Sequence, residues 1–241
     1  MSELPDIDDL WDDDEEKSGF QKVMLPFLLL GFLDGAGLYG LIADPELLLT
    51  PAKKKRLTSK SLKYAAASAR TTKKALARQI DLALEKGESV KQLGKRIDRL
   101  FGSEMGYRSL RIARTQLTET INEGTLAALV DEGNRYKQWS TVIDGRERPS
   151  HAAANGQIVP IHEKFQLEGG SCMAPGDDEL PPGEKIGCRC TIVSTDTDPR
   201  HARAMARIFL RTHSSLERRY VISLRRAFRA QRGRILSRLP S

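Results

Sequence analysis

The sequence has few cysteines, no basic residue near its N-terminus and almost no acidic residue near its C-terminus. Its three cysteines, Cys172, Cys188 and Cys190, form an odd count without the spacing of a disulfide framework, so we expect no disulfides and a reducing cytoplasm. The first sixteen residues contain no Lys or Arg, where a secretory signal would be basic, so no such signal is expected. A G-x-S-x-G elbow and a phosphate-cradling P-loop are also missing. The commonest signs of serine hydrolases and nucleotide-binding enzymes are therefore absent.

Charge is divided unevenly along the chain. The first sixteen residues contain nine Asp or Glu, whereas residues 200–241 contain twelve Arg and a single acid, Glu217. Such a basic segment can contact the phosphates of double-stranded DNA, and its aromatic residues are too few for stacking on single strands. A solvated helix face, an acidic partner protein and the chain's own acidic end are alternatives that the sequence leaves open. The candidate DNA-contacting residues are Arg218, Arg219, Arg225, Arg226, Arg229 and Arg232.

The hydropathy pattern divides the chain into four ranges. Residues 1–19 are predicted to be an acidic disordered tail with one docking turn at Leu10-Trp11. Residues 20–132 show helical periodicity, residues 133–194 change to short alternating segments, and residues 195–241 return to a basic helical pattern. The predicted fold class is therefore α+β, with a mostly helical N-terminal half, a small loop-rich mixed α/β module and a basic C-terminal helical tail.

Turn residues mark where the predicted helices end. Gly87 is expected to end one helix and Ser89 to begin the next. Apolar residues at helical spacing are predicted to form the core. They are Leu76, Ile80, Ala83 and Leu84 in the first helix, Val90, Leu93, Ile97 and Leu100 in the second, and Leu110, Ala113, Leu117 and Ile121 in the third.

One apolar stretch, Val23–Ala43, is as long as a membrane span. Pro26, Asp34 and four glycines weaken that interpretation, because they disfavour an isolated helix and put a charge near the bilayer centre. A buried or partner-covered helix is the favoured prediction, and membrane contact is not expected. A membrane anchor stays open as a hypothesis that predicts detergent-dependent solubility.

The range 133–194 has the pattern of a small strand-containing module. Alternation from Trp139 to Ile143 predicts a strand that ends in a tight turn at Asp144-Gly145. Asn155-Gly156 is a hairpin-type turn signal leading into a second strand over 157–161. A long irregular loop over 169–183 then precedes a third strand over 189–193.

The same module carries candidate metal ligands. Cys188 and Cys190 are two positions apart, so in an extended strand both sulfurs point to one face and could bind one ion, with His151 as a third ligand. Asp144, Cys172, His162 or water could be the fourth. A structural zinc ion would stabilise a module with so little core. The alternative is that the cysteines are small buried packing groups and His151 bonds to a loop carbonyl.

Asp144 and its neighbours could also form a polar network without metal. Arg146 and Arg148 can donate charge-assisted hydrogen bonds to Asp144 and fix the loop. In an enzyme, Asp144 and His151 could instead be an orienting acid and a base. No nucleophile accompanies them in the sequence, so a structural role is favoured and no residue is predicted to be catalytic.

The order of these features resembles one known family. The run W-S-T-V-I-D-G-R-E-R-P-S-H, then N-G-Q-I-V-P-I, then P-P-G-E-K-I-G-C-R-C-T, follows a helix reading A-R-T-Q-L-T-E-T-I-N-E-G. In this order, from about Phe20 to Val193, the chain resembles the phage Mu F-like minor head protein family, also called phage head morphogenesis proteins. The residues that carry the resemblance are Arg114, Thr115, Trp139, Asp144, Arg148, His151, Gly156, Cys188, Arg189 and Cys190.

The resemblance implies a structural role in a tailed-phage or prophage head. It implies a minor head protein that acts in head morphogenesis near the portal, with portal and other head proteins as partners and no small-molecule substrate. Contact with packaged double-stranded DNA is a separate expectation, which rests on the basic C-terminal segment. The resemblance also implies that the Arg114-Thr115 helix docks the Trp139 module, and that the protein is found in the host cytoplasm during assembly and then in the virion. The competing hypothesis is a metal-dependent hydrolase or nuclease that uses His151, Asp144 and the Cys188/Cys190 pair.

Overall fold

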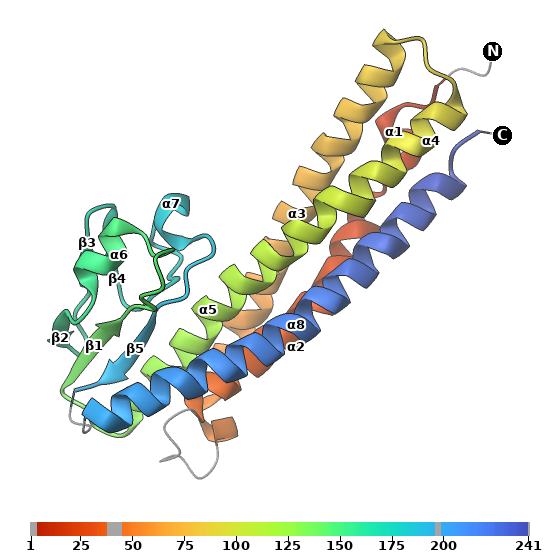
Figure 1. The fold of residues 1–241 in the computed structure, drawn as a ribbon. Coiled ribbons are helices and arrows are strands. Elements are labelled where there is room, and N and C mark those ends of the chain that lie inside the picture. Colours follow the sequence, from red (N-terminus) through yellow and green to blue (C-terminus); the bar gives the residue numbers. More distant parts are fainter. Residues whose placement is uncertain (1–3, 38–44, 196–198, 241) are drawn as a thin grey trace. The chain divides into compact units, whose positions relative to one another are not determined.

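The computed structural model describes residues 4–37, 45–195 and 199–240 (Figure 1). Long helices and a few short antiparallel strands confirm the predicted α+β class. The chain forms two compact units, and each is described by itself. Unit 1 comprises residues 1–26, 56–110 and 220–241, and unit 2 comprises residues 27–55 and 111–219.

The elements alternate between long helices and a strand-rich middle. The helical elements are α1 (Ile7–Leu10), α2 (Asp13–Ala36), the 3-10 helix η1 (Pro45–Leu48), α3 (Pro51–Glu85), α4 (Val90–Arg99), the π-helical turn η2 (Leu100–Glu104), α5 (Met105–Asp131), α6 (Pro149–Ala154), α7 (Pro182–Lys185) and α8 (Pro199–Ser237). The strands are β1 (Tyr136–Ser140), β2 (Ile158–Pro160), β3 (Phe165–Leu167), β4 (Gly170–Cys172) and β5 (Thr191–Ser194).

The two units cut across the predicted ranges. Helices α2, α3, α5 and α8 each contribute residues to both units. The predicted module, 133–194, lies wholly in unit 2, together with helical residues on either side of it in the sequence. Hydropathy along the chain marks where helices give way to strands. It carries no information about which distant segments share a core.

Helix ends in unit 1 follow their turn residues. Gly87 has a φ of 61° after the last turn of α3, as a C-capping glycine requires. Ser89 begins α4, and its backbone N–H donates to the Gln92 side chain at 2.7 Å. Most of the predicted core positions of these helices are buried. The prediction that Leu84 belongs to the core was wrong. Leu84 is 55% exposed, because it lies one position past the buried stripe that includes Leu76, Ile80 and Ala83.

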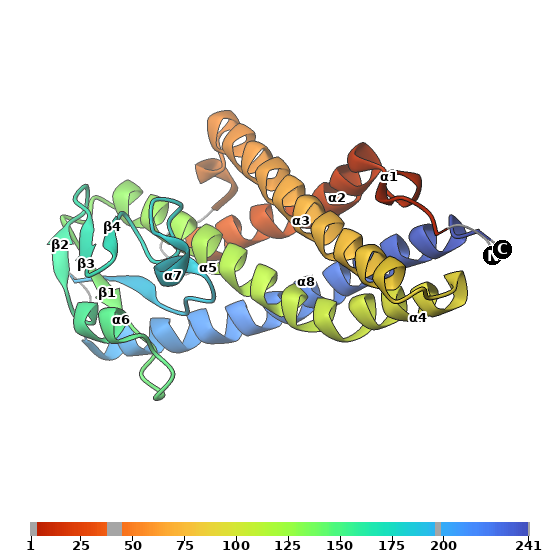
Figure 2. The ribbon, with the colours of Figure 1, turned by 90° about the horizontal axis from the view of Figure 1, so that it is seen from above.

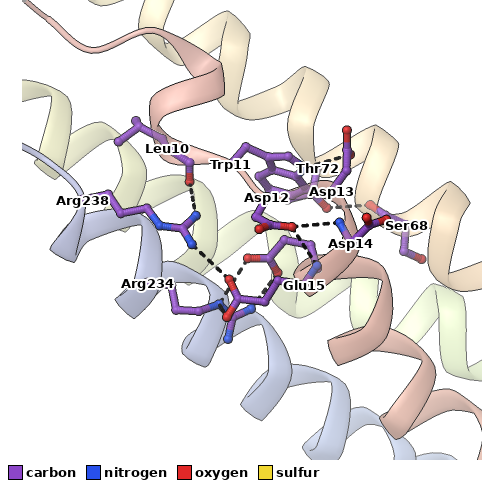
Figure 3. Close-up of polar contacts among 11 residues, drawn as sticks. Leu10, Trp11, Asp12, Asp13, Asp14, Glu15, Ser68, Thr72, Arg234 and Arg238 are labelled. Carbon is purple, nitrogen blue, oxygen red and sulfur yellow. Dashed lines mark hydrogen bonds and ion pairs between the residues drawn. The ribbon is translucent and has the colours of Figure 1, made fainter.

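The acidic N-terminus differs from the prediction of a disordered tail. From residue 4 onward it contains α1 and the start of α2, and Leu10 and Trp11 are buried, as the docking-turn prediction expected. Figure 3 shows Arg234 and Arg238 of α8 reaching to this segment within unit 1. The Arg238 guanidinium bonds to the Leu10 carbonyl and to Glu15, both at 3.0 Å. The acidic residues are thus ordered by counter-charges from the far end of the chain, which a local composition rule does not see.

The apolar stretch forms the second half of α2. Along α2 as a whole, large apolar residues recur every four positions and are all buried. They are Phe20, Met24, Leu28 and Phe32. By length and composition α2 could cross a membrane, but 44% of its apolar window is buried, and buried core helices satisfy the same criteria. Residues 38–44 of the predicted stretch lie outside the described residues. A covered helix therefore stays the favoured prediction, and the partial burial does not test the membrane alternative.

The strands of unit 2 form two small sheets. The first has the order β2-β1-β5, with β1 antiparallel to both neighbours, and the second pairs β3 with β4. Figures 1 and 2 both show these strands gathered with α6 and α7 beside α5. Side chains of β1 alternate, so that Lys137 and Trp139 are fully buried while Tyr136 is exposed.

Three strand predictions need adjustment. The first strand covers 136–140 rather than 139–143, the second 158–160 rather than 157–161, and the third 191–194 rather than 189–193. Asn155-Gly156 does make a turn, with a φ of 84° at Gly156, but it joins α6 to β2 instead of closing a tight hairpin. The sequence did not predict α6, α7, β3 or β4, because elements of three to six residues are too short to show periodicity.

Candidate functional site

Three candidate ligands meet in unit 2. His151 lies on α6, and Cys188 and Cys190 lie on the segment just before β5. The His151 Nδ1 atom is 3.3 Å from the Cys190 sulfur and 3.7 Å from the Cys188 sulfur. All three residues are buried, and their ligand atoms lie within 4.8 Å of one another. We call these residues the His-Cys-Cys cluster.

Local contacts orient the His151 ring. Pro149 occupies the first turn of α6, where its missing N–H costs no hydrogen bond. The buried Trp139 ring packs edge-on against the His151 ring, with centroids 5.5 Å apart. The Thr141 hydroxyl donates to the His151 carbonyl at 2.7 Å and accepts a bond from the Trp139 indole N–H at 2.9 Å. The tryptophan singled out in the sequence therefore supports the imidazole directly.

Glu184 is a site residue that sequence reasoning missed. Its Oε2 atom lies 2.9 Å from His151 Nε2, an ion-pair distance, although it is off the direction of a good hydrogen bond. The Ser150 hydroxyl donates to the same Oε2 at 2.8 Å. Glu184 stands in the first turn of α7, two residues after Pro182. The only signal in the sequence was a carboxylate in a proline-bounded turn, which does not by itself point to a distant histidine.

The other proposed fourth ligands have different surroundings. Asp144 accepts two hydrogen bonds from Arg189 at 2.6 and 2.8 Å and one from the Arg146 side chain at 2.7 Å. The hydrogen bonds from Arg189, and to a lesser extent the one from Arg146, hold the pKa of Asp144 well below its usual range. Cys172 is buried in β4, where burial raises its pKa to about 12, and His162 is exposed. Of the side chains that the structure describes, only the His-Cys-Cys cluster is close enough to share one ion.

The two thiols of the cluster do not titrate alike. A hydrogen bond from Cys188, and then the neighbouring His151, lower the pKa of Cys190. The same shared hydrogen bond, together with burial, raises the pKa of Cys188 well above its usual value. The pair of thiols therefore loses one proton readily and holds the second tightly. A bound cation would favour loss of the second proton as well.

Side chains of helix α5 hydrogen-bond to the backbone around the cysteine pair. The Thr115 hydroxyl accepts from the Gly187 N–H at 2.9 Å, and the Thr118 hydroxyl donates to the Cys188 carbonyl at 2.7 Å. The Asn122 amide donates to the Cys190 carbonyl at 3.0 Å. All of these residues belong to unit 2. The helix that was expected to dock the Trp139 module therefore holds the backbone on both sides of the cysteine pair.

Two arginines complete the docking contacts. Arg114 is half-buried and donates two hydrogen bonds, at 3.1 and 3.0 Å, to Glu217, the single acid of the basic tail. Arg148 precedes α6 and bonds to the Ile186 carbonyl. An acid that looked isolated in the sequence is thus the ionic partner of the docking helix.

The basic residues of α8 are divided between the units. Arg218 and Arg219 belong to unit 2, and Arg225, Arg226 and Arg229 belong to unit 1; all five are exposed. The sixth candidate, Arg232, is half-buried and lies 3.6 Å from Asp98. The structure therefore leaves five of the six candidate arginines open to solvent.

Comparison with known proteins identifies the family. Residues 56–193, more than half of the 241 residues, match the family described as Phage Mu protein F like protein. The chain belongs to this family. The matched region contains both the docking residues of α5 and the whole His-Cys-Cys cluster. The two halves of the site are therefore part of the family's shared region.

One relative of the chain is a named phage head protein. The protein named minor head protein GP7, from Bacillus phage SPP1, is 27% identical over 122 residues, which cover 49% of this chain and 39% of the relative. The match thus spans less than half of that relative's length. No solved structure matches the chain.

Proposed function

We propose that this protein is a minor head protein of a tailed phage or prophage that works by binding, near the portal, during head morphogenesis. The match of residues 56–193 to the Mu F-like family carries the proposal, and the name of the SPP1 relative supports it. On this proposal the protein assembles in the host cytoplasm and is then part of the virion head. Its partners are the portal and other head proteins.

The exposed side of the first sheet supports a role in binding. Tyr136 on β1 and Ile158 on β2 are 45% and 55% exposed. In the antiparallel register Tyr136 pairs with Pro160 and Ile158 with Gln138, so these side chains share one face. Exposed apolar side chains grouped on a rigid sheet are suited to contact with another protein.

The first test is co-purification with the portal protein of the same phage or prophage. We expect the two proteins to comigrate on size exclusion, and the double variant Tyr136→Ser with Ile158→Ser to weaken the complex roughly tenfold, since each loses apolar contact area. Leu84→Ser is the matched control, because Leu84 is also 55% exposed but lies on α3 in unit 1. Absence of the protein from purified heads, together with no portal complex, would contradict the proposal.

We further propose that the exposed arginines of α8 contact packaged double-stranded DNA. The triple variant Arg225→Gln, Arg226→Gln and Arg229→Gln should reduce duplex binding uniformly across sequences. The slope of log affinity against log salt should become shallower by about 2 to 3, because each lost phosphate contact contributes about 0.9. Fluorescence anisotropy at several salt concentrations measures both effects.

The control for this experiment removes the same amount of charge elsewhere in unit 1. Lys86, Lys91 and Lys95 are exposed, on or near α4, and their triple Gln variant changes the net charge equally. Binding that falls equally in both triple variants would show an effect of net charge alone. That result would remove α8 as the DNA-contacting element.

A further inference from the structure

We infer that the His-Cys-Cys cluster binds one divalent metal ion of the zinc type, with Glu184 holding the histidine in the ligating orientation. This inference concerns a site in unit 2 and does not depend on the proposed role in the phage head. Its starting observation is that three soft or borderline donors, His151 Nδ1 and the sulfurs of Cys188 and Cys190, lie within 4.8 Å of one another and are buried. This donor set suits zinc, whereas magnesium and calcium prefer oxygen ligands.

The separations fit one tetrahedral ion. Zinc–sulfur bonds of about 2.3 Å and zinc–nitrogen bonds of about 2.0 Å place a sulfur and a nitrogen about 3.5 Å apart across a tetrahedral angle. The two nitrogen–sulfur distances in the structure, 3.3 and 3.7 Å, lie on either side of that value. By these two distances, the imidazole nitrogen lies within a few tenths of an ångström of the tetrahedral separation from each sulfur.

Glu184 completes the arrangement typical of a metal-bound histidine. Its carboxylate lies 2.9 Å from His151 Nε2, on the side of the ring opposite the sulfurs, while Nδ1 faces the two sulfurs. The Ser150 hydroxyl in turn bonds to the Glu184 carboxylate. Glu184 is thus a positioning residue that acts through His151.

Contacts within the protein also hold the two cysteines in place. Hydrogen bonds from Thr118 and Asn122 fix the carbonyls of Cys188 and Cys190, and the Cys190 N–H points to the Cys188 sulfur at 3.4 Å. A ligand set that is positioned in advance loses little conformational entropy when the ion binds. The ion would join α6 to the segment before β5, which are far apart in the sequence.

The fourth coordination position is open. All three ligands line a cavity of about 30 Å³, which has room for about one water molecule. Arg146, Arg148 and Arg189 also line this cavity. Glu147 lines it as well, and Arg146 and Arg189 are already paired with Asp144. We assign the fourth position to water.

A thiol nucleophile is the competing interpretation of the same atoms. Cys190, His151 and Glu184 stand in the order nucleophile, base and orienting acid. That arrangement has no use for Cys188, whose sulfur also faces His151 Nδ1, at 3.7 Å. The convergence of two buried thiols on one nitrogen therefore favours the metal.

The test is metal binding by the full chain. Protein purified with Zn²⁺ in the medium should contain about one zinc per chain by elemental analysis. Replacement with Co²⁺ should give thiolate-to-cobalt charge-transfer absorption and the intense visible bands of tetrahedral coordination. Cys188→Ser and Cys190→Ser should each abolish these bands, whereas Cys172→Ser, the matched buried thiol outside the cluster, should keep them.

Glu184→Gln tests the positioning role separately. It should lower Co²⁺ affinity about 10- to 100-fold while leaving the shape of the absorption spectrum unchanged, because the ligands themselves are intact. Circular dichroism verifies that each variant is folded. Chelator competition on the unmodified protein gives a measure of affinity that needs no variant.

Three results would overturn the inference. They are less than one tenth of an ion per chain after incubation with Zn²⁺, an equal loss of the cobalt spectrum in Cys172→Ser, or a cobalt spectrum that persists in Cys190→Ser. Metal-free protein whose Cys190 is alkylated rapidly, with no protection by Zn²⁺, would favour the thiol nucleophile instead.

Discussion

Replacing Asn122 with Ala is expected to lower the free energy of unfolding of unit 2 by about 4 kcal/mol. The two N–H groups of the Asn122 amide are shared among the carbonyls of Thr118, Pro175 and Cys190, and its carbonyl accepts from the Thr191 hydroxyl and the Ile192 N–H, all within 3.2 Å. Asn122 is completely buried. Each buried partner left without a hydrogen bond costs about 1–3 kcal/mol, and water entering the space left by the amide offsets part of the sum.

The measurement is urea denaturation followed by tryptophan fluorescence. The chain has two tryptophans, so a Trp11→Phe background leaves Trp139 as the reporter of unit 2. Thr115→Val is a graded control, because it removes one hydrogen bond from the Gly187 N–H and should cost roughly 1 kcal/mol. Equal losses in the two variants would contradict the central role given to Asn122.

The second large effect is expected at Gly124. A methyl group on Gly124 of α5 would lie 2.0 Å from the Phe32 carbonyl oxygen and 2.9 Å from the Ala36 nitrogen of α2. These are backbone atoms, so α2 and α5 must move apart within unit 2 to accept it. Gly124→Ala should therefore destabilise unit 2 by about 3 kcal/mol, at the upper end of overpacking costs.

Gly233→Ala is the matched control with the opposite sign. Gly233 also lies within a long helix, α8, but has no atom within 4 Å of the added methyl group. Helix propensity alone should stabilise this variant by about 1 kcal/mol. If Gly124→Ala also raised the denaturation midpoint, close contact between α2 and α5 would be refuted.

The glycines of α2 had a different meaning in the sequence. There they argued only that Val23–Ala43 is a poor membrane helix. In the structure a methyl group on Gly35 would lie 1.9 Å from the Ile121 carbonyl, which is the reciprocal of the contact at Gly124. The sequence thus contained the signal for close helix packing, but a glycine does not name its partner helix.

The candidate site was predicted in part. Cys-x-Cys spacing placed two thiols on one face, because spacing within a strand is a local relation, and His151 was named as the candidate third ligand. Glu184 was missed and Asp144 was considered as a ligand although it pairs with Arg189, because both contacts join segments far apart in the chain. Nothing in local spacing distinguishes which carboxylate reaches the imidazole and which reaches an arginine.

The sequence by itself determined the helix ends at Gly87 and Ser89, the α+β class and the order of motifs that identifies the family. These depend on backbone conformation and periodicity within a few residues, which a linear chain displays directly. Only the tertiary structure decided that the acidic N-terminal residues are ordered by Arg234 and Arg238, and that Asn122 supports the cysteine pair. Burial and ion pairing depend on which distant segments meet, and that is settled by packing of the whole unit.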